Sequence, residues 1–237
     1  MKIKFSSAFR SDQEEIMDSF ELSGEEMQNV LTDLKTVNKY LGGNNITING
    51  ISKLLKNHSF VNEITIIDLG CGDGEMLRQC AKYGIKNGYN FKLIGIDGNS
   101  YILEEASKRS ASFKNISFIQ MDIFSEEKFS VSFDIALCTL FLHHFKEDSI
   151  IDLLQKLVDN AKLGVVVNDL ERNKIAFNLF SIASRIFLRT RIARHDGLVS
   201  VARGFKRDEL FKMSKKLNLK QFSIGWKWAF RFQWILK

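Results

Sequence analysis

The chain has 237 residues, enough for one large α/β domain with a well-buried core. Hydrophobic residues make up 45% and charged residues 26%, a balance that excludes disorder over most of the length. The net charge of +6 at pH 7 comes from basic residues spread along the chain apart from one cluster, which favours a solvated surface over attraction of an anionic ligand, nucleic acid or membrane.

The first predicted elements are helices within residues 11–57, starting near Glu14. From Val30 to Leu41, apolar residues recur at spacings of three and four and give one apolar face. The pair Gly42-Gly43 is typical of a helix C-cap, and a second helix is predicted over residues 47–55. Residues 1–57 are therefore expected to form a helical N-terminal extension to an α/β domain over residues 58–237.

Strands and helices then alternate. Short apolar runs rich in β-branched residues alternate with helical segments, which predicts βαβ units and a mostly parallel sheet. The predicted strands are 64–69, 91–97, 116–121, 133–138 and 163–167, and the predicted helices are 75–83, 101–110 and 148–160.

The alternation stops at residue 174. Residues 174–193 are predicted as one long helix within an insertion over residues 173–196, and a helix over 207–217 resumes the fold. Residues 219–234 are expected to form an antiparallel pair that turns near Gly225, with one heavily aromatic face that includes Trp228 and Trp234. The pair completes a seven-stranded sheet of Rossmann-like α/β class.

A glycine-rich turn over residues 68–74 reads Asp-Leu-Gly-Cys-Gly-Asp-Gly and lies between a predicted strand and a predicted helix. Glycine permits tight geometry and close approach of a ligand to the backbone. The spacing Gly-x-Gly-x-Gly differs from that of dinucleotide-binding turns, which disfavours NAD. Asp68 is expected to orient the loop or to bind the cationic end of a ligand.

Carboxylates follow the next two predicted strands. Asp97 ends the second strand, where an acidic side chain can accept hydrogen bonds from both hydroxyls of a ribose. Asp122 follows the third strand, where a carboxylate can accept from an adenine amino group while Ile123 packs on the ring. These positions predict a nucleotide-like ligand at the carboxyl edge of the sheet.

In this order the motifs resemble those of class I S-adenosylmethionine (SAM)-dependent methyltransferases, over residues 60–170. The resemblance rests on the loop 68–74, on residues 95–97, on Asp122, and on the run from 133 to 144 that ends in Leu-His-His. It implies that the loop holds SAM, that S-adenosylhomocysteine (SAH) is the product, and that residues 138–140 lie at the methionyl end. Gly98 departs from the family pattern, so Ile123 or a neighbour has to cover adenine. The expected cofactor-binding residues are Asp68, Gly70, Cys71, Gly72, Gly74, Asp97, Gly98, Asp122, Ile123 and Cys138.

Short motifs in the flanks resemble bacterial small-molecule methyltransferases, some of which sit beside polyketide-type biosynthetic enzymes. These motifs are residues 14–18, 38–43, 168–172 and 196–205. The resemblance implies a small, hydrophobic or aromatic acceptor that is methylated at oxygen or carbon, in secondary metabolism or in lipid- or quinone-like metabolism.

Two histidines are the expected catalytic residues. His144 follows the fourth strand at the ligand-binding edge, and His195 closes the inserted segment. Either can accept a proton near neutral pH, and one of the adjacent pair His143 and His144 is expected to pack structurally; catalysis by positioning alone is the alternative. Asp169 and Glu171 are weaker candidates, and no metal site is expected.

The inserted helix carries an apolar stripe that includes Ile175, Leu179, Ile182 and Ile186, with arginines toward its end. The stripe predicts either a lid over an apolar acceptor pocket, with arginines that attract an anionic substrate or membrane, or a helix packed on the core. The expected partners are therefore a small-molecule acceptor and a peripheral membrane contact through residues 174–194, with the chain a monomer or a homodimer.

An RNA methyltransferase and a non-catalytic SAM-binding protein are the alternatives. Amino-directed base methyltransferases resemble one another in an Asn/Asp-Pro-Pro-aromatic motif after the fourth strand, but this chain has no proline, which disfavours a nucleic-acid partner. The three cysteines have no repeated spacing and indicate neither a disulfide framework nor a zinc site. With no signal-peptide pattern and no apolar run of membrane length, we expect a cytoplasmic protein.

Overall fold

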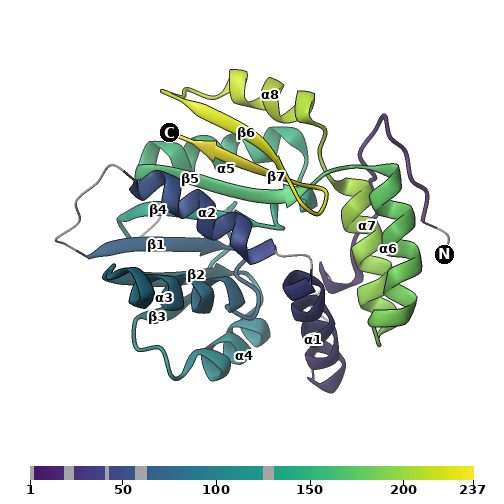
Figure 1. Cartoon of the computed structure of the whole chain (residues 1–237), viewed down its shortest axis with the longest axis horizontal. Helices are drawn as coiled ribbons and strands as arrows, with labels where there is room; N and C mark the ends of the chain where they lie inside the picture. The colour runs from purple at the N-terminus through teal and green to yellow at the C-terminus, as the bar shows by residue number, and fades with distance from the viewer. Residues whose placement is uncertain (1–2, 19–23, 41–42, 57–62, 125–130) are drawn as a thin grey trace.

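The computed structural model describes residues 3–18, 24–40, 43–56, 63–124 and 131–237. A seven-stranded sheet runs through this part of the chain in the order β3-β2-β1-β4-β5-β7-β6 (Figure 1). Neighbouring strands from β3 to β5 are parallel, and β7 is antiparallel to both β5 and β6. The strands are β1 (Ile64–Leu69), β2 (Phe91–Asp97), β3 (Ile116–Gln120), β4 (Phe133–Thr139), β5 (Ala161–Leu170), β6 (Phe222–Lys227) and β7 (Arg231–Leu236).

The strand order reverses between β1 and β4. From β1 the chain moves outward to β2 and β3 and then returns to β4 on the other side of β1. In open α/β sheets such a reversal leaves a crevice at the carboxyl ends of the strands, and ligands bind there. The sheet confirms the predicted Rossmann-like class, and β1 and β2 have the predicted bounds.

Helices cover both faces of the sheet (Figure 1). Ile66 of β1 belongs to a core shared with α2, α3 and α4, whereas its neighbour Ile67 belongs to a core shared with α5 and α8. Because successive side chains of a strand point to opposite faces, this double cover explains the continuous apolar runs. These helices are α2 (Gly43–Leu55), α3 (Glu75–Asn87), α4 (Ser100–Ser110), α5 (Glu147–Asn160) and α8 (Arg207–Lys216).

The remaining helices lie beyond the carboxyl ends of the strands, on the right of Figure 1. They are the 3-10 helices η1 (Ile16–Asp18) and η2 (Leu142–His144) and the α-helices α1 (Gly24–Tyr40), α6 (Lys174–Phe187) and α7 (Arg191–Arg203). α6 packs on α7, and α7 also contacts α1, η1 and η2. Within the described ranges we find no helix that is both long and apolar enough to span a bilayer.

The helical start predicted near residue 14 is wrong. Residues 3–15 contain neither helix nor strand. The Ser11 N–H donates to the Ala202 carbonyl at 3.1 Å, and the Arg10 side chain donates to the His143 carbonyl at 2.7 Å. Distant partners therefore hold this segment in an irregular path against α7 and η2, and they override the local helical pattern.

Gly43 begins α2, four residues before the predicted helix start, and is not a C-cap. A side chain at Gly43 would collide with the guanidinium of Arg231 in β7, and one at Gly50 would collide with Val166 in β5. Glycine at these two positions therefore lets α2 lie directly on the sheet. Gly42 lies outside the described residues.

The single helix predicted over residues 174–193 is divided into α6 and α7. At the junction, the Asp33 carboxylate of α1 accepts the backbone N–H groups of Arg189 and Thr190 at 3.0 and 2.8 Å. The Thr190 hydroxyl accepts the Ala193 N–H at 3.2 Å, which is a standard N-cap for α7. The break therefore depends on a carboxylate 156 positions away, which local sequence does not reveal.

The hairpin turn lies at residues 228–230, and the turn predicted near Gly225 is wrong, because Gly225 is paired within β6. Phe230 has a φ of 54°, and its carbonyl accepts the Glu171 N–H at 2.8 Å, which fastens the turn to the end of β5. The predicted single aromatic face is also wrong: Trp234 is fully buried and Trp228 is 68% exposed.

Candidate functional site

The glycine-rich loop of residues 68–74 joins β1 to α3 at the carboxyl edge, beside the point where the strand order reverses. Gly70, Gly72 and Gly74 have φ angles of 63°, 51° and 75°, in the left-handed region that favours glycine. A side chain at Gly70 would collide with the ring of Phe141, whereas a Cβ on Gly72 would meet no protein atom within 4 Å. The loop therefore leaves open space at Gly72, where a ligand can approach the backbone.

Asp97 ends β2 and contacts this loop. Its Oδ2 accepts the Gly72 N–H at 3.1 Å, and its Oδ1 accepts the Asn99 N–H at 3.0 Å. Burial raises the pKa of this carboxyl, and the backbone hydrogen bonds counteract the rise in part. Because a carboxylate can accept about four hydrogen bonds, this carboxylate retains capacity for a further donor from a ligand.

Asp68 is the first residue of the 68–74 motif and the penultimate residue of β1. Its side chain is buried, and Oδ1 has no hydrogen-bond partner. Burial, together with the charge of Asp97, raises the pKa of Asp68 to about 8. A buried acceptor without a donor costs about 1–3 kcal/mol, so a cationic or N–H group of a ligand would be stabilising here.

The side chains of Cys71 and Cys138 do not line this open space. Both are buried in the two apolar cores of the sheet, and burial raises the pKa of both thiols well above the usual value. Cys71 Sγ lies where a Cβ on Gly95 would stand. A binding role for either cysteine is therefore confined to its backbone.

Gly98, Asp122 and Ile123 lie at the neighbouring strand ends. The Met121 N–H donates to the Asp97 carbonyl at 3.1 Å, which joins the end of β2 to the segment after β3. Gly98 and Asp122 are exposed, and Ile123 is half-buried against the core. The fold thus places the predicted ribose and adenine residues along one edge.

Two arginines that the sequence did not single out hold the far end of the loop. Arg78 Nη2 lies 3.2 Å from Asp73 Oδ2, and Arg109 Nη1 lies 2.9 Å from the same oxygen. Arg78 Nη1 also donates to the Asp73 carbonyl at 2.5 Å. Asp73 is therefore fixed to α3 and α4. An acidic residue within the glycine loop, Asp73, was the feature of the sequence that could have predicted basic partners here.

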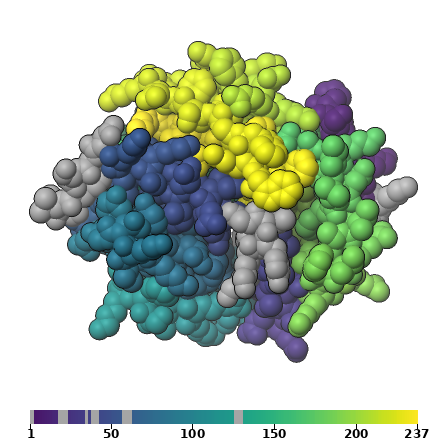
Figure 2. Space-filling model, viewed as in Figure 1, coloured from purple at the N-terminus to yellow at the C-terminus, as the bar shows by residue number. Residues whose placement is uncertain are grey.

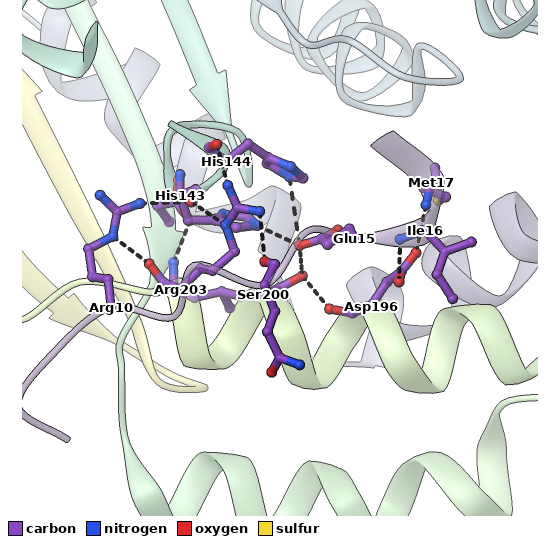
Figure 3. A network of polar contacts seen from close by, with 12 residues as sticks. Arg10, Glu15, Ile16, Met17, His143, His144, Asp196, Ser200 and Arg203 are labelled. Atoms are coloured by element: carbon purple, nitrogen blue, oxygen red, sulfur yellow. Dashed lines mark hydrogen bonds and ion pairs between the residues drawn. The ribbon is translucent and has the colours of Figure 1, made fainter. Parts of the chain in front are cut away.

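A second group of polar side chains surrounds η2, beyond the end of β4 (Figure 3). His143 is buried, with Nδ1 2.7 Å from Asp169 Oδ1 and Nε2 3.3 Å from Glu15 Oε1. Burial lowers the pKa of this imidazole, but the charge and hydrogen bond of Asp169, with those of Glu15, outweigh burial and raise it to about 9. His143 is therefore a buried imidazolium between two carboxylates.

His144 shares Glu15 with His143. The two rings are 4.3 Å apart between centroids, and His144 Nε2 lies 3.9 Å from Glu15 Oε1. Burial raises the pKa of Glu15, but its hydrogen bond to His143 and the charges of both histidines lower it overall. The side chain of His144 is 17% exposed against 2% for His143, so His144 is the member of the pair that a ligand can reach.

His195, the other predicted catalytic residue, lies on α7. Its Nδ1 is 2.9 Å from Asp196 Oδ1. The Asp196 carboxylate also accepts the N–H groups of Ile16 and Met17 at 2.8 and 3.0 Å, so it holds η1 against α7. Ser200 Oγ lies 2.8 Å from the Asp196 carbonyl and 2.6 Å from Glu15 Oε1, which connects this position to the η2 cluster (Figure 3).

Sequence reasoning missed Arg10, Glu15 and Arg203. The guanidinium groups donate to the η2 backbone: Arg10 Nη2 and Arg203 Nε lie 2.7 and 3.0 Å from the His143 carbonyl, and Arg203 also donates to the His144 carbonyl. Arg10 and Arg203 are 133 and 60 positions from His143. Glu15 and Arg203 fall within the flanking motifs 14–18 and 196–205. Those motifs indicated a resemblance to small-molecule methyltransferases but predicted no role for either residue.

The two weaker catalytic candidates, Asp169 and Glu171, lie in different places. Asp169 belongs to the η2 cluster, whereas Glu171 Oε2 accepts an indole N–H of β6 at 2.9 Å. Glu15, His143 and His144 present three possible metal-ligand atoms within 4.8 Å of one another. The cationic ring of His143 already lies between the two carboxylates, and the guanidiniums of Arg10 and Arg203 lie alongside. Positive charge at this place disfavours a metal ion, and the absence of a metal stays a prediction.

The chain is similar to known methyltransferases in sequence and in fold. Residues 66–164 match a family model described as a methyltransferase domain, and no curated protein matches the chain. The plantazolicin methyltransferase BpumL in complex with SAH is 15% identical, covers 93% of each chain and has a TM-score of 0.67. The magnesium protoporphyrin IX methyltransferase ChlM of Synechocystis PCC 6803, with bound SAH, is 14% identical over 85% of this chain and 87% of its own (TM-score 0.55).

A putative O-methyltransferase of Nostoc punctiforme PCC 73102 is 18% identical, with a TM-score of 0.60. It matches 97% of this chain and 64% of its own length. At these identities the likeness to solved structures is one of fold.

Proposed function

We propose that this chain, a class I SAM-dependent methyltransferase, transfers the methyl group of SAM to an oxygen or carbon atom of a small hydrophobic or aromatic acceptor. The observation that carries the proposal is the open glycine loop at the strand-order reversal, with the unpartnered carboxylate of Asp68 behind it and Asp97 beside it. Secondary metabolism, or lipid- or quinone-like metabolism, is the proposed setting.

The residues at this edge fit SAM. The buried, unpartnered oxygen of Asp68 suits the ammonium of the methionyl end, and the carboxylate of Asp97 retains acceptor capacity for a ribose hydroxyl. SAM, when bound, would supply a methyl carbon on a sulfonium, so the protein needs no covalent nucleophile. The remaining proposed contacts are the loop positions Gly70, Cys71, Gly72 and Gly74, the adenine-side residues Gly98, Asp122 and Ile123, and the backbone of Cys138.

Aromatic rings connect the loop to η2 and support an apolar acceptor. Phe141 lies against Gly70, and its ring centroid is 5.0 Å from that of Phe145 in an edge-on arrangement. Phe124 makes a similar contact with Phe145 at 4.7 Å and is 43% exposed. Such a wall suits a flat, hydrophobic substrate, because aromatic pairs favour these geometries.

Within the η2 cluster, we assign the proton acceptor to His144. His143 is already protonated and is held between two carboxylates, so it cannot accept a second proton. His144 Nε2 faces Glu15, whose negative charge stabilises the imidazolium that forms when His144 takes the acceptor's proton. His195, oriented by Asp196, is the second candidate for this role.

The domain organisation we propose follows from this assignment. Residues 58–237 are the proposed methyltransferase domain. Of the N-terminal extension of residues 1–57, α2 packs on the sheet, and the segment before α1, together with the insertion of residues 173–196, is proposed to supply the acceptor side. Glu15 comes from the first addition and His195 from the second. All three cysteines are unpaired, which supports the proposed cytoplasmic location.

The test is to incubate the full chain with SAM carrying an isotope-labelled methyl group, in parallel with a metabolite extract and with total RNA, and to identify products by mass spectrometry. We expect label in an apolar metabolite of low mass. Label in RNA would overturn the proposed acceptor class. SAM binding by calorimetry, with no labelled product from any extract, would favour a non-catalytic SAM-binding protein. Binding of NAD and not SAM would remove the cofactor assignment itself.

A further inference from the structure

The outward face of α6 carries a row of exposed apolar side chains. Ile175, Leu179, Ile182 and Ile186 are 62%, 53%, 65% and 73% exposed. Their spacing of four, three and four positions places them on one side of a helix with 3.6 residues per turn. The opposite side of α6 is buried against α7. The helix is therefore packed through the other side, on α7, and the stripe itself does not face the core. We call these four residues and Phe187, which is 64% exposed, the α6 stripe.

The tip of the β6–β7 hairpin extends this apolar surface. Trp226 and Trp228 are 49% and 68% exposed. The hairpin contacts the segment just before α6, because Trp226 Nε1 donates to Glu171 Oε2 at 2.9 Å. Figures 1 and 2 show the tip beside α6. In the described part of the chain, seven of the twelve exposed large apolar residues belong to the α6 stripe or the hairpin tip.

The charge on the segment that carries the α6 stripe is positive. Residues 173–195 include five basic residues and no aspartate or glutamate. Lys174, Arg185, Arg189 and Arg191 are exposed. The acidic groups in contact with this segment include Asp33, which accepts backbone N–H groups of the α6–α7 junction, and Asp196, which faces His195 on α7. An apolar stripe bordered by cationic side chains is the pattern of a helix that lies in the headgroup region of an anionic bilayer.

We propose that the α6 stripe and the hairpin tip dock the chain on the surface of a membrane that contains anionic phospholipid. A second copy of this chain is a poorer occupant, because a twofold contact would bring the two sets of arginines together. RNA is also a poorer occupant, because it offers no apolar partner to the stripe. Tryptophan is enriched at the membrane interface, in keeping with the hairpin tip. Docking through this face places α6 between the bilayer and α7, one helix away from the proposed acceptor side. An acceptor dissolved in lipid is the consequence, which rests on the proposed function.

The experiment measures co-sedimentation of the full chain with vesicles of phosphatidylcholine, with and without phosphatidylglycerol. We expect binding to the anionic vesicles that weakens as salt is added. Leu179→Asp combined with Ile182→Asp should reduce the partition coefficient by about tenfold or more, because two charges would enter the apolar layer. Ile85→Asp is the matched control, since Ile85 is 78% exposed on α3, and its binding should equal that of the wild type.

A second pair of variants tests the charge. Arg185→Ala and Arg189→Ala should each lower binding to anionic vesicles by about fivefold, with little effect on neutral vesicles. Circular dichroism reports folding of every variant and calorimetry with SAM is a separate readout, so loss of docking is distinguished from failure of the proposed function. Absence of wild-type binding to anionic vesicles, or equal binding by the double aspartate variant, overturns the proposal. So does a lipid-free dimer that the same variant dissociates, because the stripe would then belong to a second copy.

Discussion

The two sides of the proposed active site are constructed by different means. The loop side is formed by backbone: positive φ angles at Gly70, Gly72 and Gly74, and a carboxylate 25 positions away that accepts a loop N–H. The η2 side is formed by charge, from His143 and side chains as far as 133 positions away. A site formed by backbone loses ligand binding when a side chain fills the space that the ligand needs. A buried ionic cluster loses stability when one of its charges is removed. Substitutions should therefore separate binding from stability.

The largest expected effect is on the loop side. Gly72→Val should reduce SAM binding below detection by calorimetry, because the new side chain occupies space that is open in the protein and needed by the ligand. The φ of 51° adds strain of roughly 1–2 kcal/mol, so the fold should persist. Gly88→Val is the control, since Gly88 has a φ of 73° and equally open space at the end of α3. Equal SAM binding by both variants would contradict the placement of SAM at Gly72.

Sequence alone could anticipate the loop side because its parts are local. Residues 68–74 form one contiguous motif. The strands β1 and β2 are apolar runs that stop at a glycine or a polar residue, so their bounds can be predicted from the sequence. The burial of Cys71 and Cys138, in contrast, depends on which face of the sheet each side chain joins. That property needs the fold.

The η2 side could be anticipated only in part, for the opposite reason. His143 and His144 are adjacent in sequence, and only the carboxylates of Glu15 and Asp169 distinguish the buried imidazolium of His143 from the more accessible ring of His144. The same limit applies to the α6–α7 break, which a carboxylate of α1 fixes. Long-range partners decide these features, and a pattern read within a short window does not contain them.

On the η2 side, His143→Leu should lower the free energy of unfolding by about 3–5 kcal/mol near neutral pH, because it leaves two buried carboxylates without their shared cation. The pKa of His143 is raised from 6.5 to about 9. Its stabilisation is therefore complete below pH 6.5 and is lost as the pH rises through 9. Urea titrations should show the gap to wild type narrowing over that interval.

Lys162→Ala is the control for His143, since Lys162 pairs with Asp134 at the surface with 62% of its side chain exposed, and we expect no measurable change. A His143→Leu protein as stable as wild type at pH 6 would contradict the role of charge in this cluster.

Next in size is the effect of His144→Ala on turnover. Loss of a general base lowers kcat by about 10²–10⁴-fold, while SAM affinity should stay close to that of wild type because the loop side is untouched. Rates are measured with the acceptor identified by labelling, and His195→Ala is assayed in parallel with a smaller expected loss. Wild-type rates in both single variants and in the double variant would assign catalysis to positioning alone.

Asp97→Ala should weaken SAM binding by about tenfold or more, since a hydrogen bond to a charged group contributes roughly 1.5–3 kcal/mol. The control is Asp134→Ala, because Asp134 accepts the Thr65 N–H at 2.7 Å at the opposite, amino edge of the sheet. Both variants lose a carboxylate that supports a strand end, and only Asp97→Ala should lose affinity by calorimetry. Equal affinities would place the ribose elsewhere.

The smallest expected signal is a proton released when SAM binds. The pKa of Asp68 is raised to about 8 by burial and by Asp97, so near pH 7 the carboxyl is largely protonated in the free protein. An ammonium placed beside its unpartnered oxygen favours the charged form, and binding should expel up to one proton. Calorimetry in buffers of different ionisation enthalpy measures that number.

Asp68→Asn keeps the shape of the side chain and cannot ionise, so it should bind SAM more weakly and release no proton through this position. The same variant should flatten the pH dependence of stability between about pH 4 and 8. In wild type, a raised carboxyl pKa stabilises the fold at low pH, and that contribution is lost as the pH rises through the folded value. Equal proton release by wild type and Asp68→Asn would move the ammonium contact away from Asp68. The loop side would then rest on Asp97 and the glycine backbone alone, with the buried carboxyl of β1 serving only to orient the loop.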